Sequence, residues 1–494
     1  MFLKFCHIGR IINFQNPHRD FCYNITFEKR VTDYLLGTWE AAAEQRTAFL
    51  ETLQNHPWQA GDHLHLELNL IEVDGFSCSG LRDLSPLHGL PFKEATIVGN
   101  ENRGATPSLR LQGLGAFQLL QAVHIAGAQN VAHVLCDLPF VHTIDIGAFD
   151  NDFMEKMGAK NQLRALSFSS CDRRHNRYFP INLDILGLFT INLTRLNLSY
   201  CTYFEDCKIL SPCKKLEVLD CSHCSRLKST EGLEGCPDLV KVNLWVTNIY
   251  RTGGLANHPK LRELRLTNES KSLEFLQTCP NIEVLMLHKQ GDLQKLPFLP
   301  KLRELELSQS FLIHSRHTQE TPWPNLTQPL QLKKLAFGQA GFYVGGIRHH
   351  RASLTEEFGD KPLPSDCGEG ETFESFLNKD TPDPGSDPDI LARILSMCSK
   401  EHLEELHLPM CCVASDVSQL ATYPNLKVLD LSRSNVKAIP ASFAALKSLQ
   451  PLDLDSCQKL EAVNVPGCVS LVHCNVRFCR KMSEAQKKAL APLL

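Results

Sequence analysis

Apolar residues recur at a fixed spacing through the middle of the chain. Between residues 193 and 308, they occupy the first, fourth and sixth places of a short segment that returns every 20 to 23 residues. We number these places as repeat positions, so that positions 1, 4 and 6 are apolar. The six clearest repeats begin at Leu193, Leu216, Leu239, Leu261, Ile282 and Leu302. Near-alternation predicts a short β-strand in each repeat, and the period predicts a solenoid.

The segments between the strands should close each turn. A turn of about 22 residues cannot bury its own apolar face, so successive turns must stack into one continuous core. A further apolar residue follows ten to twelve places after position 1, as Phe204 and Leu227 do. The segments at 253–258 and 272–279 are expected to be short helices or 3₁₀ turns. Prolines end several such segments, because proline disfavours helix in the residue before it.

The L-x-x-L-x-L core at this period resembles the leucine-rich repeat family. The resemblance covers about residues 90 to 482, because the triplet also returns outside the central stretch. These further triplets begin at Phe92, Leu120, Val141, Leu163, Leu332, Leu403, Leu426, Leu449 and Leu471. The resemblance implies an α/β leucine-rich repeat solenoid, a curved coil with a parallel β-sheet on its concave face and short helices or 3₁₀ turns on its convex face.

The 20 cysteines fall largely into repeating slots. Twelve of them occupy position 9, the place three residues before position 1, or the triplet itself: Cys171, Cys201, Cys224, Cys411, Cys457 and Cys479; Cys213, Cys236, Cys279 and Cys468; Cys221 and Cys474. A buried free thiol behaves as a small hydrophobe, and these ladders resemble the cysteine-containing subfamily. They indicate a reducing intracellular compartment. The cytoplasm is favoured, and the cationic, apolar segment 1–24 leaves mitochondrial import as an alternative.

Changes in pattern divide the chain into five segments. Residues 1–62 are expected to form an N-terminal extension and helical cap, and residues 63–337 to form repeats that are irregular up to about 192. Residues 338–386 are a Gly/Pro-rich charged insertion, residues 387–482 resume the repeats, and residues 483–494 form a C-terminal capping helix. The insertion is either a binding loop or a tolerated solvent-exposed loop.

No catalytic signature is present. The chain lacks a P-loop, a nucleophile elbow, an H-E-x-x-H motif and a Gly-rich dinucleotide turn. Cys221 and Cys224 have C-x-x-C spacing, but a zinc site needs four converging ligands, so a structural pair is favoured. We therefore expect neither an enzyme nor a cofactor. The net charge of −4 gives no indication of nucleic acid binding, and no apolar run reaches the roughly 18 residues that suggest a membrane span.

What remains is the outward surface of the strands, where positions 5 and 7 should be exposed. Trp245 stands out there, and the candidate protein-binding residues are Tyr200, His223, Trp245, Arg265, Met286 and His288. Trp245 could instead merely cover a neighbouring turn. A possible second site in the insertion comprises Arg348, His349, His350 and Arg351.

The family resemblance implies a non-enzymatic scaffold or adaptor that binds protein partners. Two alternatives stay open: a structural subunit of a large intracellular assembly, such as an organellar ribosome or a cytoskeletal complex, and a substrate receptor of a ubiquitin ligase.

Overall fold

The computed structural model describes most of the repeats. The described residues are 6–12, 21–27, 51, 55, 63–70, 88–99, 114–126, 138–146, 162–168, 192–201, 203–268, 273–288, 296–308, 326, 328–337, 342–344, 347–349, 390–409, 416–490 and 493. They fall into two compact units. Unit 1 comprises Met1–Leu227 with Gly235–Asp238, and unit 2 comprises Lys228–Glu234 with Leu239–Leu494.

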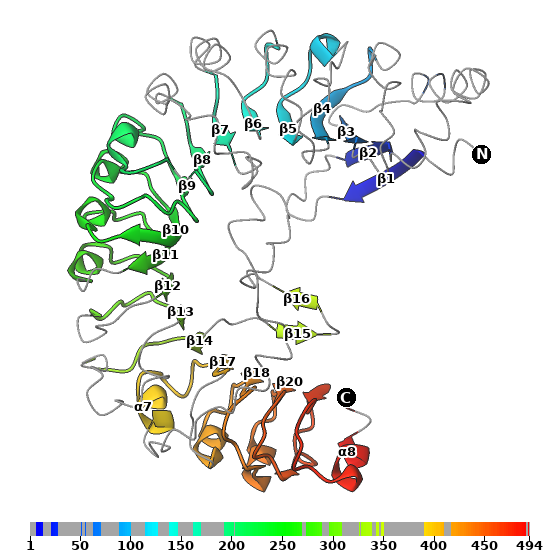
Figure 1. Cartoon of the computed structure of the whole chain (residues 1–494), viewed down its shortest axis with the longest axis vertical. Helices are drawn as coiled ribbons and strands as arrows, with labels where there is room; N and C mark the ends of the chain where they lie inside the picture. Colours follow the sequence, from blue (N-terminus) through cyan, green and yellow to red (C-terminus); the bar gives the residue numbers. More distant parts are fainter. Residues whose placement is uncertain are drawn as a thin grey trace. The chain divides into compact units, whose positions relative to one another are not determined.

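Unit 1 contains a sheet whose strands follow one another in chain order (Figure 1). The strands are β1 (Cys6–Ile12), β2 (Phe21–Phe27), β3 (His63–Leu70), β4 (Phe92–Gly99), β5 (Ala122–Ala126), β6 (Thr143–Ile146), β7 (Ala165–Ser167), β8 (Arg195–Asn197) and β9 (Val218–Asp220). β1 pairs with β2 antiparallel. From β2 to β9 every neighbouring pair is parallel.

The first two strands lie where the sequence pattern predicts only an N-terminal extension with a helical cap. Most of the expected helix at 30–60 lies outside the described residues. The segment Phe21–Phe27 is rich in aromatic and β-branched residues, which favour strands. It carries no leucine triplet, so a search for repeats passes over it.

Unit 2 continues the same architecture. Its main strands are β10 (Lys241–Ile249), β11 (Glu263–Asn268), β12 (Val284–His288), β13 (Glu304–Ser308), β14 (Lys334–Phe337), β17 (Glu405–His407), β18 (Val428–Asp430), β20 (Pro451–Asp453) and β22 (His473–Asn475). They pair in parallel in this order. β15 (Phe342–Val344) and β16 (Ile347–His349) form an antiparallel hairpin, and β19 (Ala438–Ile439) pairs with β21 (Ala462–Val463).

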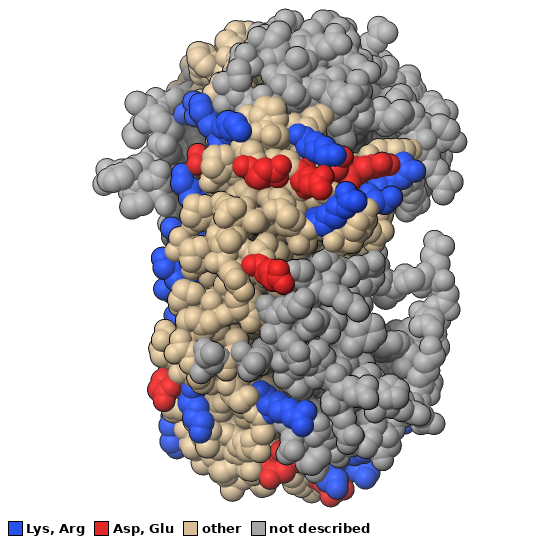
Figure 2. All heavy atoms as spheres, turned by 90° about the vertical axis from the view of Figure 1, so that its left-hand side faces the viewer, with Lys and Arg blue, Asp and Glu red and all other residues tan. Residues whose placement is uncertain are grey.

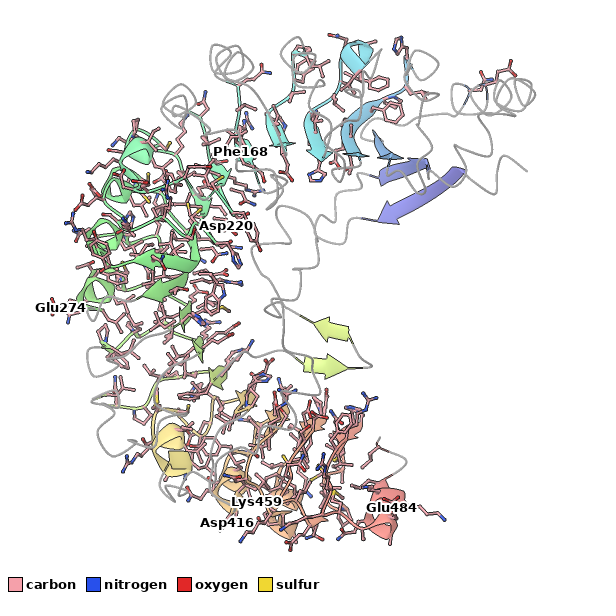
Figure 3. All side chains as sticks on the ribbon, in the orientation of Figure 1. Phe168, Asp220, Glu274, Asp416, Lys459 and Glu484 are labelled. Atoms are coloured by element: carbon pink, nitrogen blue, oxygen red, sulfur yellow. The ribbon has the colours of Figure 1, made fainter. Side chains whose placement is uncertain are left out.

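Short helical turns connect the strands, as the repeat pattern predicts. They are η3 (Leu114–Ala116), η6 (Lys208–Leu210), η7 (Leu233–Gly235), η8 (Gly253–Leu255), η9 (Glu274–Thr278), η11 (Ser418–Thr422), η12 (Ala441–Ala445), α7 (Ile390–Ser396) and α8 (Glu484–Leu490). In unit 2 these turns lie on the outer side and the strands on the inner, concave side; Glu274 and Asp416 mark the outer side in Figure 3. The Ser483 hydroxyl caps α8 by accepting the Gln486 N–H at 3.3 Å.

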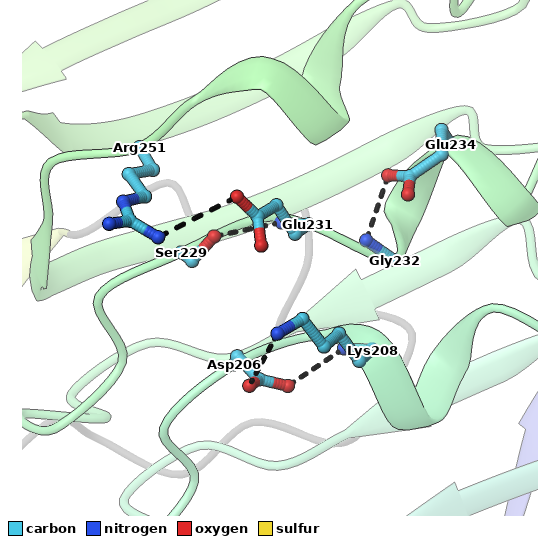
Figure 4. A network of polar contacts seen from close by, with 7 residues as sticks. All are labelled: Asp206, Lys208, Ser229, Glu231, Gly232, Glu234 and Arg251. Carbon is cyan, nitrogen blue, oxygen red and sulfur yellow. Dashed lines mark hydrogen bonds and ion pairs between the residues drawn. The ribbon is translucent and has the colours of Figure 1, made fainter.

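Side chains close the ends of these outer turns. In unit 1 the Asp206 carboxylate accepts the Lys208 N–H at 3.0 Å just before η6. In unit 2 the Ser229 hydroxyl accepts the Glu231 N–H at 3.1 Å, and the Glu231 carboxylate lies 3.8 Å from the Arg251 guanidinium (Figure 4). These contacts satisfy N–H groups that a short turn leaves without an internal acceptor.

The core is a stack of the predicted triplets. Strand register sets Leu264 beside Leu285 and Leu285 beside Leu305, and all three are buried. In unit 1, Phe168 occupies position 6 of its repeat and is fully buried (Figure 3). Each repeat therefore supplies one layer of a continuous apolar core, which is how a 22-residue unit becomes stable.

Twelve described cysteines are buried thiols: Cys201, Cys207, Cys213, Cys221, Cys224, Cys236, Cys279, Cys398, Cys457, Cys468, Cys474 and Cys479. Cys171 and Cys411 lie outside the described residues. The position 9 thiols donate to the position 6 carbonyl of the preceding repeat, as Cys224 does to Leu198 at 3.1 Å and Cys457 to Leu431 at 3.2 Å. The cysteine ladder thus links turns by weak hydrogen bonds.

Candidate functional site

The outward strand positions are less exposed than the alternation predicts. At position 5, Asn197, Asp220 and Asn243 are buried, and at position 7, Thr267 and His288 are buried. The prediction that positions 5 and 7 are exposed is therefore wrong for these residues. Pleating points their side chains away from the leucine core, but short polar side chains fold back onto the backbone and are covered by neighbouring strands.

A ladder of side-chain caps explains this burial. In repeat after repeat, the position 5 Asn or Asp accepts the backbone N–H of position 7, at 2.8 to 3.2 Å. The capping residues are Asn197, Asp220, Asn243, Asp430, Asp453 and Asn475. Asn and Asp commonly bond to the N–H two residues on, so each cap fixes the turn at which a strand ends. Asp220 is marked in Figure 3.

The residue after each cap adopts the left-handed backbone conformation. At position 8, φ lies between 55° and 65° in Tyr200, His223, Val246, Arg433, Ser456 and Phe478. Non-glycine residues rarely adopt this region. Here hydrogen bonds to the next repeat hold it: the Tyr200 N–H donates to the Ser222 carbonyl at 2.8 Å, and the Arg433 N–H to the Asp455 carbonyl at 2.7 Å.

Four of the six candidate binding residues gather on the strand face of unit 2. The Trp245 and His288 rings lie 4.7 Å apart between centroids, tilted by 47°. They meet across Thr267, which lies between them at position 7 of β11 and beside His288 in register. Met286 and Arg265 are neighbours in register, and the Arg265 guanidinium lies 3.2 Å from the Glu263 carboxylate. Trp245 is half-buried and His288 is buried, so this aromatic site is more sheltered than predicted.

The other two candidates lie together in unit 1. The Tyr200 and His223 rings stack with centroids 4.4 Å apart and planes 10° from parallel. Both residues are half-buried. The six residues thus form two aromatic pairs, each described within its own unit.

A carboxylate column on the same face of unit 2 escaped the sequence patterns. Register aligns Glu306, Ala336, His407, Asp430 and Asp453 at position 5 of β13, β14, β17, β18 and β20. The available signal was the run of acidic residues at position 5 in repeats that an insertion separates in sequence. Only the pairing of β14 with β17 makes that run continuous.

The surroundings of this column shift its protonation. Burial raises the pKa of Glu306 and of Asp430. Burial, and next the charge of Asp430, raise the pKa of Asp453 to about 7. His407 lies 3.7 Å from the Glu405 carboxylate and 4.0 Å from the Asp430 carboxylate. Desolvation disfavours the charged form of a carboxyl group, so this part of the face holds negative charge at a cost in free energy.

Charges on the outer side are arranged differently. In the face drawn in Figure 2, Lys and Arg side chains are interspersed with Asp and Glu side chains. At position 2 of unit 2, Arg262 lies 3.6 Å from Glu283, and Lys427 lies 2.7 Å from Glu404. Such exposed pairs contribute little to stability, but they leave no strong field of one sign there.

Chemistry other than binding finds little support among the described residues. No three His, Cys, Asp or Glu side chains in that part of the chain form a group that could hold a metal ion. Burial raises the pKa of the Cys221 and Cys224 thiols, which keeps them protonated and unreactive. Of the second candidate site, Arg348 and His349 lie in β16, whereas His350 and Arg351 lie outside the described residues. The described helices include none that is long and apolar enough to cross a membrane.

The parallel register of position 4 residues through both units, one strand per repeat of 20 to 30 residues, decides the fold. The chain folds as a leucine-rich repeat solenoid. No family model matches this leucine-rich repeat chain. Over 53 residues, 11% of its length, it is 45% identical to a probable disease resistance protein of Arabidopsis thaliana, and the match spans 6% of that protein.

Several solved leucine-rich repeat structures are similar to it. The protein LIC12759 of Leptospira interrogans has 14% identity and a TM-score of 0.36, with 81% of this chain and 94% of the other covered. The functional domain of InlJ from Listeria monocytogenes, which includes a cysteine ladder, has 14% identity and a TM-score of 0.40, with 79% and 69% covered. TLR13 in complex with ssRNA13 has 16% identity and a TM-score of 0.47, with 88% and 63% covered.

Proposed function

We propose that this leucine-rich repeat chain is a non-enzymatic scaffold that binds a protein partner through the strand face of unit 2. The observation that carries the proposal is the aromatic site formed by Trp245, Met286 and His288 beside Arg265. Large aromatic residues, Met and Arg are enriched in the anchors of protein interfaces. A half-buried Trp245, held by the His288 ring, presents its apolar surface in one fixed orientation, which lowers the entropy lost on binding.

The adjoining residues fit binding better than catalysis. Val246 follows Trp245 and is 40% exposed in the left-handed conformation. Arg265 is already engaged with Glu263, so its charge helps to orient a partner without being buried alone. The part of the chain that the structure describes places no nucleophile and base together beside Trp245.

The test compares three variants of the full chain in partner capture from cells that make it. Trp245→Ala combined with Arg265→Glu should weaken binding by at least about 2 kcal/mol, about 30-fold in Kd. Phe298→Ala is the matched control, because Phe298 is 39% exposed in the segment before β13, away from the strand face.

Proteins recovered in stoichiometric amounts with the native chain are quantified against all three variants, and the affinity is then measured with the purified partner. Circular dichroism confirms that each variant folds. Equal affinity for the double variant and the native chain would remove the strand face of unit 2 as the binding surface.

A further inference from the structure

The strand face of unit 2 carries an excess of carboxylates. Positions 3, 5 and 7 of the repeats from β10 to β22 hold seven acidic and four basic residues among those described, a difference of three. The acidic residues are Glu263, Glu304, Glu306, Glu405, Asp430, Asp453 and Asp455, and the basic residues are Lys241, Arg265, Lys334 and Arg477. The face is therefore complementary to a cationic partner.

The excess is greatest toward β20. Arg265 is paired with Glu263 at 3.2 Å, and Lys334 lies beside Glu304 in register. Beyond β14, Glu405, Asp430 and Asp453 follow on successive strands with His407 among them. The aromatic site and this carboxylate column thus occupy two ends of one sheet face.

Strand spacing fixes the separation between the two ends. From Met286 on β12 to Asp430 on β18 the column crosses four strand intervals, which is about 19 Å at about 4.8 Å per interval. An extended chain advances about 3.3 Å per residue. A segment that crosses the strands would span this distance in about six residues.

We propose that the strand face of unit 2 binds an extended, basic protein segment that sets an apolar side chain on Trp245 and Met286 and an Arg or Lys, about six residues away, on Asp430 and Asp453. The inference rests on the proposed function and adds the chemistry of the partner. A nucleic acid is disfavoured, because its phosphates would meet the same carboxylates.

Burial of the column supports this assignment. Burial raises the pKa of Asp430 and Asp453, so the two carboxylates are poorly solvated when charged. A docked guanidinium or ammonium group restores the lost solvation through charge-assisted hydrogen bonds. The groups that face Asp453 are Asp430 on β18, backed by His407 on β17, then Asp455 at the end of β20, and Asn475 on β22.

The probe is a phage-displayed library of random 12-residue peptides, selected on the full chain. Enriched peptides should carry an apolar or aromatic residue five to seven places from an Arg or Lys. Synthetic copies should bind the double variant Asp430→Asn with Asp453→Asn at least about tenfold more weakly. Their affinity for the native chain should rise several-fold from pH 6 to pH 8, because a cation binds the ionised form of Asp453 and proton release becomes easier as the pH increases.

The matched control is Asp220→Asn in unit 1. Asp220 is also a buried position 5 cap of the same geometry, so this variant removes one carboxylate without touching the column, and its affinity should stay within twofold of the native value. Asparagine keeps an oxygen that can accept the capping N–H, so all these variants should fold.

The outcomes separate the two proposals. Enriched peptides that are acidic or neutral, or basic peptides indifferent to the Asp430 and Asp453 variants, overturn this inference. If those same peptides lose affinity with Trp245→Ala, the proposed function survives. A library that yields no peptide sensitive to either set of variants overturns both.

Discussion

At the scale of single residues, the burial of Asp453 makes stability depend on pH. Its pKa is raised to about 7 in the folded chain from an ordinary value of 3.8. The folded state therefore keeps a proton that the unfolded state releases between those two values. Stability must fall as pH rises through that window and change little above it, as far as this group is concerned.

Asp453→Asn should remove this dependence while keeping the cap to the Asp455 N–H. We expect the variant to exceed the native chain in stability by about 1 to 3 kcal/mol at pH 8, and by less as the pH decreases toward 4. Urea unfolding midpoints at pH 5, 6, 7 and 8 measure the difference. Parallel curves for the two proteins would show that Asp453 is ionised in the folded chain throughout.

Close packing of backbones at one glycine gives a second residue-scale prediction. A Cβ added at Gly254 would lie 1.8 Å from the Thr230 carbonyl oxygen, whereas a Cβ at Gly253 would meet nothing within 4 Å. Gly254→Ala must push two turns apart, so we expect a loss of about 2 kcal/mol or more. Gly253→Ala, its matched control, should change stability by less than about 1 kcal/mol. Thermal unfolding distinguishes them, and equal melting temperatures would contradict the packing.

At the scale of the elements, each strand end depends on its side-chain cap. The Asp220 carboxylate accepts the Ser222 N–H at 2.8 Å, and Asp220 is buried. Asp220→Ala leaves that donor without its acceptor, and we expect a loss of about 1 to 2 kcal/mol. Asp220→Asn retains an acceptor and should lose less than about half as much. Chemical denaturation checks the ranking, and an equal loss in both variants would assign the effect to charge instead.

At the scale of the whole molecule, the buried thiols report on the integrity of the repeats. Twelve described cysteines are buried, and burial raises the pKa of, for example, Cys213 and Cys474. A protonated, covered thiol reacts slowly. We therefore expect at least twelve thiols of the native chain to resist a thiol reagent at pH 8 and to react in guanidinium. Rapid reaction of all 20 in the native chain would contradict this core.

The five-segment division of the chain stays a prediction at this scale. β14 pairs directly with β17 although residues 338–404 separate them, which supports an insertion at 338–386. The helical cap expected in residues 1–62 lies mainly outside the described residues. The cytoplasmic or mitochondrial location also stays a prediction, and it rests on the need to keep so many thiols reduced.

The sequence by itself determined the repeat, because the leucine triplets stabilise the fold only when stacked, and their spacing therefore records the strand of each turn. It also determined which cysteines are buried, since they share fixed places in the repeat. Only the tertiary structure decided which polar side chains face solvent. Asn197 and Asp220 have an outward parity but fold back as caps, and Trp245 meets a His288 that lies 43 residues away. Contacts between strands depend on register, and the pairing of β14 with β17 across an insertion sets the register that creates the carboxylate column.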